Sequence, residues 1–223
     1  MNKKLTTIIL LILLLILFFG IRSIWLENSL SDDLSVFYAN PDYQTEMYLD
    51  NFLIYKQKFN NSCGQTTISM VKSYLEKPIS ESDFSRQAGI QEGKSGMLPA
   101  QFARYLQIGL ESFKITHQKN IRDSVVLENI VQQLRKGRPV PVYFSTINDW
   151  DKPNYDTHYS AVVGVQPSNR TIRLANAYGY LETIPIPDFL LSLKYKNYQN
   201  PPLDFQIGLF FGIIDRNNLF IIE

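Results

Sequence analysis

The N-terminal part of the chain is too apolar to belong to the surface of a soluble domain. From Leu5 to Ile21 it carries no charged residue and consists mostly of leucine and isoleucine. A helix without a polar face is either fully buried or inserted in a membrane. The run is slightly longer than a signal-peptide core of ~7–15 residues and reaches the lower limit of a spanning helix, ~17–25 residues. It therefore predicts a membrane anchor or a secretory signal, and the fold must come from the residues that follow.

Residues that flank this run favour an uncleaved anchor over a cleaved signal. Trp25 follows Arg22, where an aromatic side chain would lie at the membrane interface. Small residues suited to signal cleavage are missing directly after the run, and Ser29 with Ser31 is the only tolerable pair. Two lysines precede the run and acidic residues follow Arg22, so the positive-inside rule places the body of the protein outside the cytoplasm. Cleavage would instead make the protein secreted.

The composition of the remaining chain predicts one folded domain. We expect an anchor or signal segment over residues 1–26, a polar stalk or strap over residues 27–50 and a globular domain over residues 51–223. The 223-residue chain is 45% hydrophobic and 19% charged, which suffices for a core. Its net charge is +1 without a basic cluster, so nucleic acid is not an expected partner.

Hydrophobic periodicity predicts an α+β fold, with helices first and an antiparallel sheet afterwards. Helices are predicted from Cys63 to just before Pro78, from Ser80 to Gly89, from Pro99 to Gln107, and from Ser124 to Lys136 with Asp123 as cap. Strands are predicted at Val140–Ser145, Tyr159–Val165, Thr171–Asn176, Gln206–Ile214 and Leu219–Ile222. The last two would form a terminal hairpin with its turn at Asn217-Asn218.

Cysteine and histidine are scarce in this chain. With one cysteine and two histidines, neither a disulfide nor a cysteine- or histidine-based metal site is expected, and no cofactor is implied. Cys63 lies at the predicted start of a helix, directly before Gly64. A helix N-terminus favours the thiolate and offers free backbone N–H groups, although a lone cysteine is more often a small buried residue.

Three further residues could assist a thiol nucleophile. His158 precedes the apolar strand Tyr159–Val165, and Asn176 ends the next predicted strand. A turn between these strands would return Asn176 to the end where His158 lies, and an amide there could orient the imidazole. Gln57 precedes Cys63 by six positions, from which its amide could reach an oxyanion. Taken singly, His158 and Asn176 are more readily structural residues and Gln57 could be a solvated residue of the strap, and His117 has nothing that points to a role.

The joint pattern resembles a known enzyme group. The order Gln57, Cys63-Gly64, His158, Asn176 is similar to that of papain-like cysteine peptidases. The segments NSCGQTTISMV and THYSAVVGV resemble family thirty-nine of the cysteine peptidases, which contains the bacteriocin leader peptidase domains. This resemblance implies that Cys63 is the nucleophile, His158 the general acid/base, Asn176 the residue that orients it, and Gln57 an oxyanion donor. Many relatives have Asp-Pro where this chain has Asn176-Ala177.

The resemblance implies a peptidase that cleaves peptide bonds through a thioester, and the N-terminal apolar run predicts that this peptidase is tethered to a membrane. Leader processing takes place in the cytoplasm within a transporter, whereas the expected topology puts Cys63 outside, so an extracytoplasmic peptide or protein is the expected substrate. An acyltransferase or transpeptidase would use the same residues with another acceptor. A peptidase-like binding module on a membrane anchor is the alternative from a different class of protein.

Overall fold

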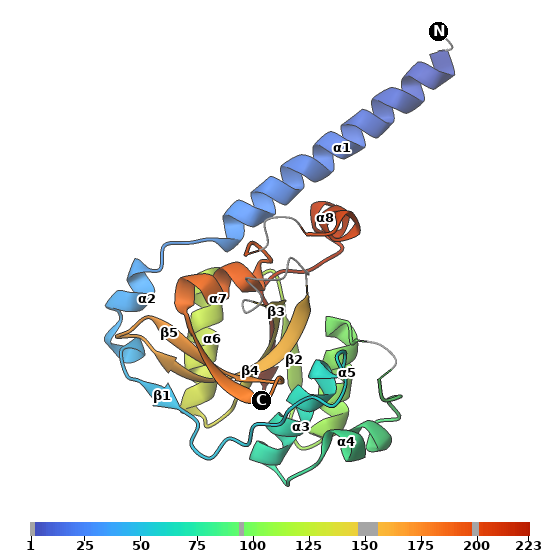
Figure 1. Ribbon diagram of the computed structural model, residues 1–223. Helices are drawn as coiled ribbons and strands as arrows, with labels where there is room; N and C mark the ends of the chain where they lie inside the picture. Colours follow the sequence, from blue (N-terminus) through green and yellow to red (C-terminus); the bar gives the residue numbers. More distant parts are fainter. Residues whose placement is uncertain (1–2, 94–95, 147–155, 198–200) are drawn as a thin grey trace.

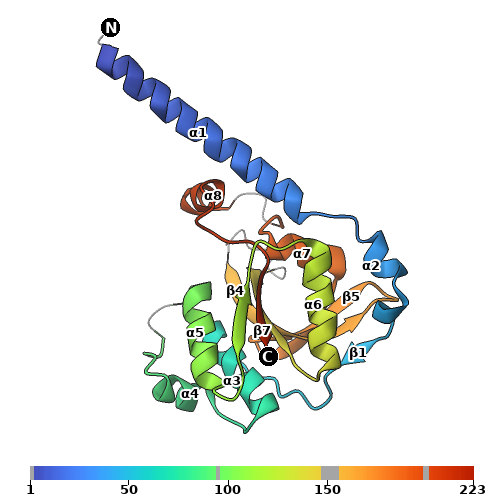
Figure 2. The ribbon, with the colours of Figure 1, turned by 180° about the vertical axis from the view of Figure 1, so that it is seen from behind.

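The computed structural model describes residues 3–93, 96–146, 156–197 and 201–223. Figures 1 and 2 show a curved sheet with helices on both faces and one long helix, α1, that projects from this body. The helices are α1 (Lys3–Leu30), α2 (Ser35–Ala39), α3 (Cys63–Leu75), α4 (Glu81–Gln87), α5 (Pro99–Gly109), α6 (Asp123–Arg135), α7 (Ile186–Leu193) and α8 (Leu203–Phe210). The strands are β1 (Met47–Tyr48), β2 (Ile115–Gln118), β3 (Val140–Ser145), β4 (Thr157–Gln166), β5 (Thr171–Asn176), β6 (Tyr180–Pro185) and β7 (Asn218–Ile222).

The sheet has seven strands in the order β2-β7-β3-β4-β5-β6, with β1 added beside β4, and all its pairings are antiparallel. This confirms the predicted α+β class with an antiparallel sheet. β4 is buried along most of its length because side chains pack on it from both faces. Tyr159 and Ala161 belong to the core under α3, α4 and α5, whereas Val162 and Val165 belong to the core under α2, α6 and α7.

The segment between α1 and the domain is a strap that packs on the body. Phe37 of α2 is 2% exposed and lies in the core beneath α6. The Asp32 carboxylate accepts a hydrogen bond of 3.0 Å from the backbone N–H of Ser124, in the first turn of α6. Residue 123, predicted as the cap, is instead the first helical residue, and its carboxylate pairs with Lys194 at 2.5 Å. The cap comes from a distant segment, which local sequence cannot indicate.

A glycine in β4 allows the strap to cross the sheet closely. Tyr48 of β1 lies opposite Gly164, where the register of β4 against β5 shifts. A Cβ at this position would fall 2.4 Å from the Tyr48 ring. Because no side chain fits into that distance, Gly164 is needed for the docking of β1.

The prediction of a terminal hairpin is wrong. Residues 206–214 were expected to form a strand, but the structure has α8 there, followed by a turn. β7 pairs with β2 and β3 instead. The apolar run is short and uniformly hydrophobic, so its periodicity cannot distinguish a strand from a helix. β2 escaped prediction because it reads Ile-Thr-His-Gln, without apolar alternation.

α1 is exposed along its apolar length. Among the described residues, one helix is long and apolar enough to cross a membrane, and it is this N-terminal one. A signal sequence would meet the same criterion. The helix continues to Leu30, beyond the predicted boundary at residue 26, and Leu30 is buried against the body.

Candidate active site

Cys63 is the first residue of α3 and lies against β4. A tight turn precedes it, in which the Ser62 hydroxyl accepts from the backbone N–H of Phe59 and the Ser62 N–H donates to the Phe59 carbonyl, both at 3.1 Å. The Cys63 side chain is mostly buried, with the residue 8% exposed. The backbone N–H of Tyr159, the residue that follows His158, is close enough to the sulfur to lower the pKa of the thiol. The helix start predicted from sequence is therefore the observed one, and it sets the thiol beside the strand that carries the histidine.

Burial dominates the ionisation of Cys63. It raises the pKa of the thiol to about 11, with a smaller upward effect from the Asp156 carboxylate. The N–H groups of Tyr159, Gly64 and Cys63 itself lower this pKa, but less than burial raises it. The helix N-terminus lowers the thiol pKa as expected, but this effect does not decide the ionisation of Cys63 in the free protein. Desolvation of the charged form outweighs the helix dipole and the three donors.

His158 and Asn176 meet across neighbouring strands. β4 pairs with β5 so that Ser160 faces Asn176, and the His158 Nε2 atom lies 3.0 Å from the Asn176 Oδ1 atom. Burial lowers the pKa of His158 to about 4, and the bond to Asn176 opposes this only partly. The imidazole is therefore neutral at pH 7. Because an amide oxygen can only accept, Nε2 carries the proton and Nδ1 remains available as a base.

The orientation of the Asn176 amide is fixed at both ends. Its Oδ1 atom also accepts from the backbone N–H of Tyr178 at 3.0 Å. Its Nδ2 group donates to the Glu182 Oε2 atom at 2.7 Å. A flipped amide would oppose the Tyr178 N–H with an NH₂ group and the carboxylate with an oxygen, so only the observed orientation satisfies both neighbours.

Glu182 is a site residue that sequence reasoning missed. It lies on β6 and is 8% exposed, whereas the preceding residue, Leu181, is 48% exposed. A strand that points an acid inward and a leucine outward reverses the usual pattern. Such reversals are expected at functional positions. The signal was present in the sequence, but β6 itself was not predicted, so the faces of its residues could not be assigned.

Tyr178 covers the imidazole. Its ring stacks on that of His158 with centroids 4.3 Å apart and planes 19° apart. Its hydroxyl donates to the Asp156 Oδ2 atom at 3.3 Å. Burial raises the pKa of Tyr178, and the nearby Asp156 and Cys63 raise it further. Tyr178 thus contacts His158 directly and is close enough to Cys63 for its charge to affect the Tyr178 pKa.

Gln57 lies close to this group, but its amide has another partner. Its backbone N–H donates to the Ala177 carbonyl at 2.7 Å, which joins the segment before Cys63 to the loop after Asn176. Its Nε2 group donates to the Phe59 carbonyl at 2.9 Å. Its Oε1 atom is buried and has no hydrogen-bond partner among the described residues. One N–H of the amide stays available for a substrate.

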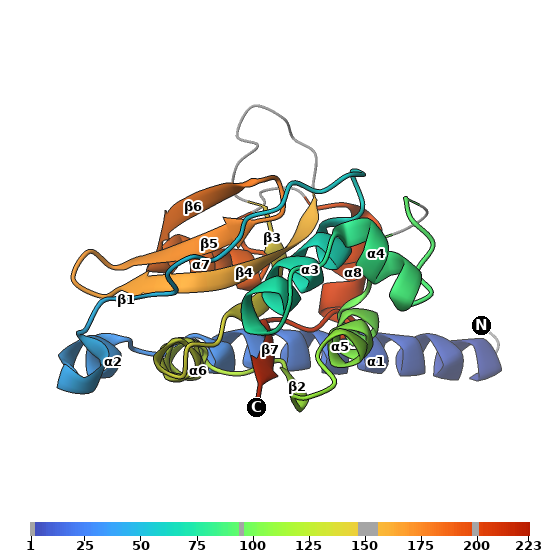
Figure 3. The same cartoon turned by 90° about the horizontal axis from the view of Figure 1, so that it is seen from below.

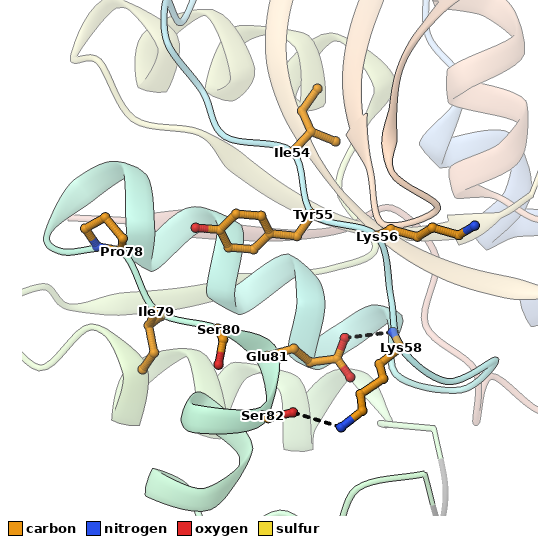
Figure 4. A pocket seen from close by; sticks show the side chains of 9 residues that line it. All are labelled: Ile54, Tyr55, Lys56, Lys58, Pro78, Ile79, Ser80, Glu81 and Ser82. Carbon is orange, nitrogen blue, oxygen red and sulfur yellow. Dashed lines mark hydrogen bonds between the residues drawn. The ribbon is translucent and has the colours of Figure 1, made fainter.

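A pocket of about 610 Å³ lies on the other side of the segment that carries Gln57. Figure 4 shows it between that segment and the start of α4. Its lining consists of Ile54, Tyr55, Lys56, Lys58, Pro78, Ile79, Ser80, Glu81 and Ser82. Glu81 accepts hydrogen bonds from the Thr66 hydroxyl (2.6 Å) and the Lys58 N–H (3.0 Å), which ties the segment to α3. The lining residues include none of the predicted catalytic residues, so the pocket is separate from the site.

The remaining sequence-based expectations concern the other histidine and metals. His117 lies on β2, where its Nε2 atom is 2.9 Å from the Asn218 Oδ1 atom and its ring stacks on Phe220. This is a structural role in the sheet. Within the described ranges, no group of three or more His, Cys, Asp or Glu side chains could hold a metal ion.

Comparison with known proteins places the chain in a family. Solved structures with a similar fold include a C39-like peptidase from Bacillus anthracis, with a TM-score of 0.52 and 11% identity over 69% of this chain and 94% of that one. Another is xylellain, a cysteine protease from Xylella fastidiosa, with a TM-score of 0.49 and 13% identity over 86% and 89% of the two chains. No curated protein sequence matches. The Peptidase_C39 like family matches residues 49–200, more than half of the sequence, and the chain belongs to this family.

Proposed function

We propose that this protein is a membrane-tethered cysteine peptidase in which Cys63 is the nucleophile and His158 the general acid/base. The observation that carries the proposal is the arrangement around β4. His158 is bonded to Asn176, and the N–H of the adjacent Tyr159 is close enough to the Cys63 sulfur to lower the pKa of the thiol. Membership of a peptidase family supports a peptide or protein substrate.

The proposed reaction begins from a neutral pair. With the thiol pKa at about 11 and the imidazole pKa at about 4, Cys63 is a thiol and His158 is neutral at pH 7. The sulfur attacks the peptide carbonyl while its proton passes to Nδ1 of His158. The imidazolium then protonates the leaving amine, which leaves a thioester on Cys63. Water attacks the thioester and gives a proton to His158. The bond between the carbonyl carbon and the Cys63 sulfur then breaks, the carboxylic acid product departs, and the imidazolium returns its proton to the sulfur.

Backbone donors are available for the oxyanion. The N–H groups of Cys63 and Gly64, which lower the pKa of the thiol in the free protein, belong to the N-terminal end of α3. Gln57 supplies a further donor through the N–H that Phe59 does not use. In this mechanism Asn176 holds the ring and favours its charged form by accepting from Nε2.

Glu182 supplies the negative charge that an aspartate in place of Asn176 would provide directly. The Asn176 amide lies between the carboxylate and the imidazole, bonded to both. When His158 becomes charged, the bond from Asn176 to a carboxylate polarises the amide oxygen and stabilises the imidazolium. Glu182 is thus a positioning residue that acts through Asn176.

Replacing Glu182 with glutamine is expected to lower kcat about tenfold while KM changes by less than about twofold. Glutamine can still accept from Asn176, so the loss measures the charge. Glu182→Leu removes the acceptor as well and should lower kcat further. The measurement is steady-state cleavage of one peptide from pH 5 to 9.

The matched control is Glu46→Gln. Glu46 also accepts a hydrogen bond from a side-chain amide, that of Gln166, but it does so at the far end of β4. Equal kcat values for Glu182→Gln, Glu182→Leu and the wild type would contradict the role.

The location of the enzyme is part of the proposal. We assign residues 1–26 to an anchor, residues 27–50 to the strap and residues 51–223 to the peptidase domain. The apolar α1 and the aromatic residue after Arg22 support a retained anchor. The lysines before the apolar run support an extracytoplasmic domain, and cleavage of the anchor would release it as a secreted form.

A peptide library tests the reaction class. The full chain, purified in detergent, would be incubated with a complex peptide mixture, and mass spectrometry would identify new termini. We expect new free N- and C-termini that do not form after alkylation with iodoacetamide. Products joined to an added amine would instead identify an acyltransferase or transpeptidase. The absence of any alkylation-sensitive product would favour a peptidase-like binding module.

A further inference from the structure

α8 is an apolar helix that the protein leaves largely uncovered. It reads Leu-Asp-Phe-Gln-Ile-Gly-Leu-Phe, and Gly208 is its only buried residue. Leu203 is 71% exposed and Ile207 45% exposed, and Ile213 in the turn after the helix is 74% exposed. Large aliphatic side chains grouped on one exposed element usually mark an interaction site.

α8 touches α1 where the uncharged run ends. The Phe211 ring packs against the Phe19 ring with centroids 4.9 Å apart. The Arg22 guanidinium donates to the Phe211 carbonyl at 3.2 Å. A Cβ on Gly20 would lie 3.5 Å from the Phe210 ring, in ordinary contact. If α1 crosses a membrane, Arg22 marks the boundary between acyl chains and water, and α8 lies at that level.

The axis of α8 is oriented as expected for a helix that lies along the membrane surface. Figure 1 shows α8 end-on beside α1, which extends across the view, and Figure 3 shows it running across α1. A helix that crosses a spanning helix at its end lies along the membrane surface. Helices in this position bury one apolar side at the boundary between headgroups and acyl chains.

α8 is also joined to the folded body. The Phe205 ring contacts the Tyr195 ring edge-on, with centroids 5.1 Å apart. Tyr195 is 3% exposed and its hydroxyl donates to the Asp215 carbonyl at 3.3 Å. A lipid contact at α8 would therefore fix the orientation of the whole domain rather than that of a loose segment.

We propose that α8 and the turn to Ile213 form a second membrane contact, inserted at the headgroup level of the bilayer that α1 spans. The inference rests on the proposed tether but not on the peptidase reaction. α8 contains no lysine or arginine and only one acidic residue, Asp204, so apolar burial drives the contact and anionic lipid is not required. Two contacts hold the catalytic domain at a fixed height and orientation, which selects substrates that approach close to the membrane.

Depth-dependent fluorescence quenching tests this contact in the full chain. Cysteines would be introduced singly at Ile213, Leu203, Leu14 and Val36 in a Cys63→Ser background and labelled with bimane. The protein would be reconstituted in phosphatidylcholine vesicles that contain lipids with a nitroxide at a shallow or a deep acyl position. We expect severalfold quenching at Ile213 and Leu203 by the shallow nitroxide, and stronger quenching at Leu14 by the deep one. Val36, 75% exposed on α2 away from α8, should not be quenched.

Labels on α8 and its turn, on α1 and on α2 distinguish the possible results of this experiment. Unquenched labels at both Ile213 and Leu203 with a quenched label at Leu14 would overturn the contact and leave the tether intact. Unquenched labels at Leu14, Ile213 and Leu203 would overturn both. An emission shift at Ile213 without lipid quenching would identify a protein partner for α8, which also overturns the proposal. Loss of peptidase activity in the Cys63→Ser background does not affect any of these readings.

Discussion

Replacing Cys63 with alanine is expected to lower the rate of peptide cleavage by at least ~10³-fold, because the reaction then has no nucleophile. The sulfur belongs to the first residue of α3, and no second cysteine exists that could replace it. Residual cleavage would come only from substrate binding and oxyanion donors. The measurement is cleavage of a single peptide from the library, under conditions in which the wild type turns over many times.

The control for Cys63→Ala is Ser69→Ala in the same helix. Ser69 is buried, and its hydroxyl has no hydrogen-bond partner among the described residues. The substitution therefore removes one buried atom from α3 but no group that takes part in the reaction. Because Ser69 is remote from the reacting atoms, we expect activity within about twofold of the wild type. Equal Tm values for the two variants would exclude unfolding as the cause. Wild-type cleavage by Cys63→Ala would refute the assignment of the nucleophile.

Replacing His158 with alanine is expected to lower cleavage at pH 7 by ~10³–10⁴-fold. Two effects contribute to this loss. General acid–base catalysis by a positioned side chain contributes ~10²–10⁴-fold. In addition, a thiol with a pKa of about 11 is ionised only on the order of 10⁻⁴ at pH 7, so without a base it almost never attacks as thiolate.

The other histidine provides the matched control. His117→Ala removes an imidazole from β2. In the wild type this ring stacks on Phe220 and is hydrogen-bonded to Asn218, both of β7. The substitution should lower stability, because a packed ring is lost, and leave kcat/KM within about twofold of the wild type. Similar losses of activity in the two variants would mean that the effect of His158→Ala is structural. Rescue of His158→Ala by added imidazole would show that the missing group is a base.

The sequence was sufficient for the parts of the site that depend on local pattern. The start of α3 at Cys63 follows from helical spacing, and the return of Asn176 to His158 follows from two strands joined by a short turn. Both are local features, since each involves one element or one hairpin. The resemblance to the peptidase family then supplied the roles, which remain to be tested.

The remaining features depend on contacts between distant segments. The carboxylate of Glu182 became recognisable only once β6 was known to pair with β5 and to point it inward. The thiol pKa could not be anticipated, because the helix start is visible in the sequence but the burial of Cys63 is not. The apolar run over residues 206–214 was misassigned because a short apolar run has the composition of a core strand as well as that of an exposed helix.

Alkylation of Cys63 by iodoacetamide from pH 4 to 10, in the full-length wild type and in His158→Ala, tests the catalytic pair most directly. His158 can accept the thiol proton wherever it is neutral, and burial lowers its pKa to about 4. The wild-type rate should therefore exceed the His158→Ala rate most strongly from about pH 5 to 7 and fall below about pH 4 as the imidazole becomes protonated. At high pH, where thiolate forms in both proteins, the two rates should converge. In His158→Ala the rate should rise about tenfold per pH unit, as thiolate forms towards the thiol pKa. Identical, steadily rising profiles for the two proteins would contradict a Cys63–His158 pair and with it the proposed peptidase.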